Sequence, residues 1–105
     1  MSFGLPDPTM SIIRAILWRH AHVDSAIIYG SRAKGTYRPG SDIDLTLVGP
    51  RLSYDDLLHI MADLDESAIP YRVDVSIFHD IGDAAVQDQI ERRGKVFYRK
   101  GANAP

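Results

Sequence analysis

The stretch from Ile28 to Leu47 constrains the fold and function of this chain more than any other segment. A short apolar run ends in Gly30-Ser31, where backbone N–H groups and a hydroxyl can approach an anion closely. A basic loop with glycine and proline follows, and the next apolar run opens with Asp42 and Asp44. Side chains alternate along a strand, so these two carboxylates are expected on one face and the apolar residues between them on the other.

This pattern favours a site for a cation and phosphates. Two carboxylates roughly 7 Å apart, the two-residue repeat of a strand, can bracket a hard cation such as Mg²⁺. Each feature alone has an ordinary explanation, because Asp-x-Asp often marks a turn and Gly-Ser often follows an apolar run. Their combination in this order, with Arg32 and Lys34 between them, favours the functional interpretation.

A third carboxylate, Asp74, lies in the middle of a predicted strand from Tyr71 to Phe78. Aspartate is depleted in strands, so this position needs an explanation. By itself, Asp74 would be interpreted as an ion-paired surface residue. With the upstream motif present, it is the natural third member of an acidic triad with Asp42 and Asp44.

The same residues carry a resemblance to a known family. Gly30-Ser31-Arg32-Ala33-Lys34-Gly35, followed by Ser41-Asp42-Ile43-Asp44, resembles the signature of the DNA polymerase beta-like nucleotidyltransferase superfamily. Within it, the chain looks like the minimal nucleotidyltransferases and their MntA-type antitoxin group. The resemblance implies a single-domain α/β nucleotidyltransferase fold, with a mixed sheet of about four strands flanked by helices. It further implies catalytic and metal-binding roles for Asp42, Asp44 and Asp74, and nucleotide-binding roles for Gly30, Ser31, Arg32, Lys34 and Ser41.

The resemblance also implies an activity. It predicts nucleotidyl transfer from a nucleoside triphosphate, here ATP, with two Mg²⁺ ions, or Mn²⁺ in their place. In the antitoxin branch the enzyme transfers AMP to a tyrosine of a small helical HEPN-type toxin, and we expect this function and a hetero-oligomer with that partner. Two alternatives stay open. One is a catalytic subunit that nucleotidylates a small molecule bound by a helical partner, and the other is a non-catalytic module that neutralises its partner by binding.

Periodicity and turn residues predict the remaining elements. The four expected strands are residues 26–29, 43–48, 71–78 and 95–99. One helix is expected from Thr9 or Ser11 to about His22, and a third one between Asp83 and Gly94. The second helix should begin at Ser53 and end before Pro70. Its expected apolar stripe consists of Leu57, Leu58, Met61 and Leu64.

Length and composition set the outer bounds. The 105 residues fit one domain, expected over residues 9–100, with a flexible lead-in at 1–8 and a tail at 101–105. The net charge of −2 argues against direct nucleic-acid binding, and the absence of cysteine excludes thiolate metal sites. No apolar run approaches the roughly 18 residues of a membrane span, so we expect a cytoplasmic protein.

Overall fold

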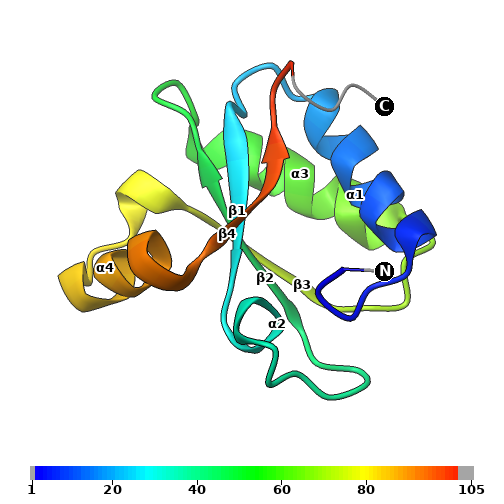
Figure 1. The fold of residues 1–105 in the computed structure, drawn as a ribbon. Coiled ribbons are helices and arrows are strands. Elements are labelled where there is room, and N and C mark those ends of the chain that lie inside the picture. Colours follow the sequence, from blue (N-terminus) through cyan, green and yellow to red (C-terminus); the bar gives the residue numbers. More distant parts are fainter. Residues whose placement is uncertain (1, 102–105) are drawn as a thin grey trace.

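The computed structural model describes residues 2–101, and a four-stranded sheet lies at its centre (Figure 1). The strands are β1 (Ser25–Tyr29), β2 (Ile43–Val48), β3 (Val73–Ile77) and β4 (Lys95–Arg99), in the spatial order β3-β2-β1-β4. β1 pairs antiparallel with both β2 and β4, whereas β2 pairs parallel with β3. The sheet is therefore mixed, which confirms the predicted fold class.

Helices cover both faces of this sheet. In Figure 1, α1 (Asp7–Trp18) and α3 (Tyr54–Glu66) lie on one side of the sheet, and α4 (Ala84–Arg93) lies on the other. The one-turn helix α2 (Ser31–Lys34) follows β1 directly, and a short 3₁₀ helix, η1 (Phe78–Asp80), follows β3. None of the helices among residues 2–101 has the length and apolar character needed to cross a membrane.

The core lies between the sheet and the α1–α3 layer. Alternate residues of β2, namely Ile43, Leu45 and Leu47, have no exposed surface, and neither has Ile28 of β1. They belong to one apolar cluster with residues of both helices, such as Ile13, Leu17 and Ile60. The residues between them in β1 and β2 therefore point to the opposite face of the sheet.

The apolar stripe of α3 differs from the prediction. The structure buries Ile60 and Leu64 and partly buries Leu57, whereas Leu58 and Met61 are 44% and 43% exposed. Residues 57, 60 and 64 are spaced by three and four, so they share one side of a helix. The predicted residues satisfy the same kind of spacing. The prediction of Leu58 and Met61 as core residues is wrong, because the helix is turned so that they lie on its outer flank.

The segment before α1 is packed rather than loose. Leu5, within the expected lead-in, has no exposed surface. Helix α1 begins at Asp7, earlier than expected, because Pro8 fits the first turn of a helix without losing a hydrogen bond. It also ends at Trp18 instead of near His22. Most of the expected tail, residues 102–105, lies outside the described residues.

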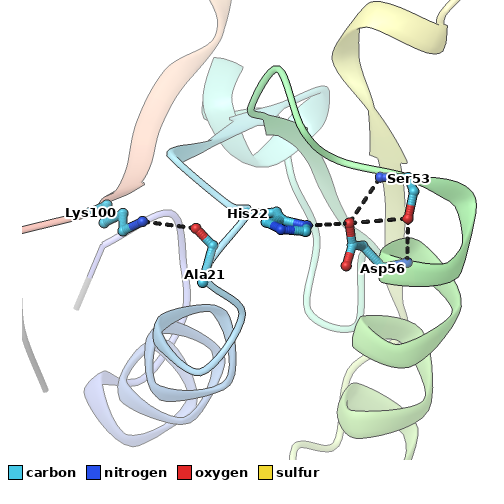
Figure 2. Close-up of polar contacts among 5 residues, drawn as sticks. All are labelled: Ala21, His22, Ser53, Asp56 and Lys100. Atoms are coloured by element: carbon cyan, nitrogen blue, oxygen red, sulfur yellow. Dashed lines mark hydrogen bonds and ion pairs between the residues drawn. The ribbon is translucent and has the colours of Figure 1, made fainter.

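The loop between α1 and β1 is held from two sides (Figure 2). On one side, an Oδ atom of Asp56 lies 2.9 Å from Nδ1 of His22 in this loop. Asp56 also accepts hydrogen bonds from the backbone N–H and the hydroxyl of Ser53, the residue that caps the N-terminus of α3. Lys100 Nζ donates to the carbonyl of Ala21 at 2.8 Å. The hydrogen bond with His22, followed by those with Ser53, lowers the pKa of Asp56. Ionised Asp56 therefore stabilises the fold above the ordinary aspartate pKa, and this contribution is lost as the pH falls through the lowered value.

Candidate active site

Three neighbouring strands place Tyr29, Asp44 and Asp74 in one row. Asp44 on β2 is the register partner of Tyr29 on β1 and of Asp74 on β3. Paired residues of adjacent strands point to the same face of a sheet. All three side chains thus lie on the face opposite the α1–α3 core, and the parallel pairing of β2 with β3 sets the two carboxylates side by side.

The carboxylates influence one another. Burial raises the pKa of Asp44 most, and the negative charges of Asp74 and then Asp42 raise it further. Asp42 itself is exposed, immediately before β2. Within residues 2–101, no three acidic or histidine side chains lie close enough together to hold a metal ion as they stand. Repulsion among like charges favours this separation, and a divalent cation would offset it.

The Gly30-Ser31 turn lies directly against this acidic row. Gly30 has φ +74° and ψ −151°, a region that is essentially restricted to glycine. A Cβ atom at this position would lie 2.5 Å from Asp44 Oδ2. The turn is thus a close-fitting backbone cradle beside a carboxylate, with Ser31, the first residue of α2, partly exposed.

These residues fit a divalent cation bound together with phosphates. Carboxylate oxygens are the hard ligands that Mg²⁺ prefers, and Mg²⁺ commonly takes its remaining ligands from water and substrate phosphates. The backbone at Gly30, where no side chain intervenes, suits close approach of a phosphate. Lys34, exposed at the end of α2, can add positive charge near such a group.

Arg32 lies in a different setting from the one expected of a phosphate ligand. It is only 2% exposed, and its Nε and Nη2 donate to the carbonyl of Ser41 at 3.1 and 2.8 Å. Its Nη1 donates to the carbonyl of Phe3 at 2.9 Å, and its guanidinium lies over the rings of Tyr37 and Tyr71. The side chain therefore fixes the loop that leads to Asp42, so we interpret it as a positioning residue.

Ser41 shapes the same loop. Its hydroxyl accepts a hydrogen bond from the backbone N–H of Arg38 at 2.8 Å, and its carbonyl is the acceptor for Arg32. This local hydrogen bond runs back to Arg38 and orders the loop immediately before Asp42. Its contribution to nucleotide binding stays a prediction.

Sequence reasoning missed a row of hydroxyl groups beside the carboxylates. Ser76 Oγ donates to Thr46 Oγ1 at 3.0 Å, and the Tyr29 hydroxyl lies within hydrogen-bonding reach of Ser76. Burial raises the pKa of Tyr29; the Ser76 hydrogen bond lowers it, and the charges of Asp44 and Asp74 raise it. Strand parity was the signal for this row of hydroxyl groups. Thr46 and Ser76 lie two residues after Asp44 and Asp74 in the same strands, so their side chains point to the same face as the carboxylates.

Asp44→Asn should make the metal-free chain more stable at neutral pH. The folded-state pKa of Asp44 is raised, so its favourable protonated form is present at low pH and is lost as the pH rises through that value. The advantage of the amide over wild type should therefore grow with pH and then level off, as urea denaturation across a pH series would show. Asp55→Asn is the matched control, because Asp55 lies in the first turn of α3, where negative charge is favourable. A less stable Asp44→Asn at pH 7 would contradict the expectation.

Comparisons with known proteins agree with this architecture. A family model described as "Polymerase beta, Nucleotidyltransferase" matches residues 12–103. A crystal structure of a toxin–antitoxin with AMP-PNP superposes with a TM-score of 0.70 at 20% identity, covering 88% of this chain and 74% of the other. A mutant of the toxin–antitoxin MntA-HpeT gives 0.68 at 17% identity, with the same coverage. A proposed nucleotidyltransferase from Sulfolobus solfataricus gives 0.55 at 18% identity, covering 93% of this chain and 86% of the other. At these identities the structures show a shared fold, and no curated protein shows a significant sequence match.

Proposed function

The chain belongs to the polymerase beta nucleotidyltransferase family, and on that premise we propose that it transfers AMP from ATP to a tyrosine of a partner protein. The partner is a small helical toxin of the HEPN type, with which the chain forms a hetero-oligomer. The observation that carries the transferase function is the pairing of Asp44 with Asp74 on one sheet face, with Gly30 packed against Asp44.

Each part of this site has a role in the transfer. The backbone of Gly30 and Ser31 binds the triphosphate, with Lys34 supplying positive charge. Asp42, Asp44 and Asp74 are the residues that would hold the Mg²⁺ ions, which when bound neutralise phosphate charge and activate the attacking oxygen. The tyrosine oxygen forms a bond to the α-phosphorus while the bond to pyrophosphate breaks. Asp74, the more exposed of the two paired carboxylates, accepts the tyrosine proton.

Structures with the same fold support a protein acceptor and ATP as the donor. Two structures with the same fold are toxin–antitoxin proteins, and one of them contains AMP-PNP. AMP-PNP resembles ATP in shape and charge, which agrees with ATP as the donor. Holding the acceptor oxygen in line with the scissile bond can lower the barrier by roughly 7–11 kcal/mol, so the partner that presents the tyrosine contributes directly to the rate.

Incubation with Mg²⁺-ATP and a small helical HEPN-type protein as the candidate partner tests the proposal. We expect pyrophosphate release and an AMP adduct on a tyrosine of that partner, detected by intact mass and peptide mapping. ATP with a methylene group between its α- and β-phosphates is the control, because its α–β linkage cannot be cleaved in the transfer.

Two outcomes would contradict this function. Neutralisation of the partner without any adduct would show antagonism by binding alone. An adduct on a small metabolite instead of the partner would favour the two-component enzyme, in which the helical protein binds the acceptor.

A further inference from the structure

One flank of α3 carries exposed apolar side chains. Tyr54, Leu58 and Met61 are 68%, 44% and 43% exposed, and their spacing of four and three residues places them in one stripe. They account for half of the large exposed hydrophobic residues among residues 2–101. We refer to these three residues as the α3 flank. A cluster of this kind on a protein surface commonly marks an interaction site.

The α3 flank borders a groove at the β3 edge of the sheet, next to the strand that carries Asp74. This groove has a volume of about 210 Å³ and runs between Met61 and Leu64 of α3 and the segment that contains Tyr71, Val73 and Asp74. Asp74 is among its lining residues because β3 is the edge strand, although the Asp74 side chain points to the opposite face of the sheet. Within the described residues, the outer edge of β3 also has no strand partner. A protein bound in the groove would lie at this open edge and could extend around it to the face that carries the Asp74 carboxylate.

The charge of this surface selects the kind of partner. Helix α3 contains five acidic residues and neither lysine nor arginine. Asp56 and Asp63 contact His22 and His20, which leaves the others, Asp55, Asp65 and Glu66, exposed. Asp65 borders the groove itself, and Arg72 is the one basic residue in its lining. The surface is thus apolar with an acidic border, which is complementary to an apolar segment flanked by lysine or arginine.

A larger groove elsewhere is less suited to an acceptor. It has a volume of about 660 Å³ and lies between α1 and α3, lined by Ile12, Trp18 and Asp63 among others. None of the candidate site residues lines it. A segment bound there would therefore not be placed at the edge of β3, the strand that carries Asp74.

We propose that the α3 flank and the adjoining groove are the docking surface for the acceptor protein. The segment that binds there is an amphipathic helix with basic residues beside its apolar face, which lies along Tyr54, Leu58 and Met61. The partner continues around the open edge of β3 and presents the acceptor hydroxyl to Asp74 on the other face of the sheet. This inference rests on the proposed function, because it assigns the surface through which the acceptor partner of that reaction is held.

A Leu58→Glu, Met61→Glu double variant tests the surface. Central apolar contacts dominate the energetics of protein interfaces, so we expect affinity for the small helical HEPN-type partner to fall by roughly 100-fold. Both residues are exposed and neither belongs to the nucleotide site, so Mg²⁺-ATP binding by calorimetry should be unchanged. If the double variant fails to fold, the milder Leu58→Gln should still weaken binding.

Matched variants locate the effect. Val96→Glu makes the same change at a 52% exposed residue on β4, at the opposite edge of the sheet, and should bind the partner normally. Trp18→Glu alters the α1–α3 groove and should also leave binding intact. Asp65→Lys should weaken binding several-fold at low salt and less at high salt, because it opposes a basic partner.

The outcomes separate this inference from the proposed function. If the double variant still binds the partner, the docking surface is wrong, and loss of binding in Trp18→Glu would place it at the α1–α3 groove instead. An AMP adduct on the partner would leave the proposed function intact in either case. Stronger binding by Asp65→Lys would refute the basic partner segment. If the wild-type chain forms neither complex nor adduct with that protein, both proposals fail.

Discussion

Gly30→Ala should abolish tight Mg²⁺-ATP binding and destabilise the chain by about 1–3 kcal/mol. The backbone at Gly30, with φ +74° and ψ −151°, is in a region that alanine adopts only under strain. The added Cβ would lie 2.5 Å from Asp44 Oδ2, so either the turn or the carboxylate must move. Because the turn and the carboxylate are both parts of the proposed nucleotide site, either movement separates the phosphate donors from the acidic residues.

Gly35→Ala is the control for the strain alone. Gly35 also has a positive φ of +83°, but a Cβ there would meet nothing within 4 Å. We therefore expect Gly35→Ala to lower the free energy of unfolding in urea and to retain Mg²⁺-ATP affinity in calorimetry. Equal nucleotide affinity in the two variants would show that the contact of Gly30 with Asp44 does not matter for the site.

Local patterns were sufficient to predict the four strands and the acidic positions on them, whereas the mixed sheet was implied by the family resemblance. β2 was predicted with the bounds it has, Ile43–Val48, because apolar alternation and the following Gly49-Pro50 define both of its ends. The caps at Ser53 and Asp83 also follow from sequence, since each side chain accepts hydrogen bonds from N–H groups of the first turn. Strand parity, together with apolar residues that face one core in both strands, predicts Asp74 on the same face as Asp44.

Contacts distant in sequence decided what could not be predicted. Arg32 follows a Gly-Ser turn, as a phosphate ligand would. However, its guanidinium donates to the carbonyl of Phe3, 29 residues before it, and lies over the ring of Tyr71, which comes well after β2. No local pattern reveals that these segments converge on its guanidinium. The stripe of α3 was ambiguous for a similar reason, because two sets of leucine, isoleucine and methionine residues satisfy helical spacing and only the position of the sheet distinguishes them.

Asp74→Asn should lower the rate of AMP transfer by at least about 100-fold. A carboxylate that binds the metal and accepts the proton contributes several kcal/mol to the transition state, and each 1.36 kcal/mol corresponds to about tenfold in rate. The amide has the same shape but neither the charge nor the basicity. Asp74 is exposed, and the substitution also removes a negative charge that raises the pKa of Asp44, so the fold should be retained.

The decisive measurement compares transfer with assembly in the same variant. Asp74→Asn should still form the complex with the partner in size-exclusion chromatography, because the α3 flank that we assign to docking is unchanged, but intact mass should show no AMP adduct. Asp88→Asn removes an exposed carboxylate that pairs with Arg92 on α4, and should behave as wild type in both assays. The partner should then stay active in the presence of Asp74→Asn and lose activity with Asp88→Asn. Asp74→Asn differs from wild type in its catalytic carboxylate and not in the proposed docking surface. If it neutralises the partner as well as wild type does, binding alone is therefore sufficient and the acidic triad is not needed for antagonism.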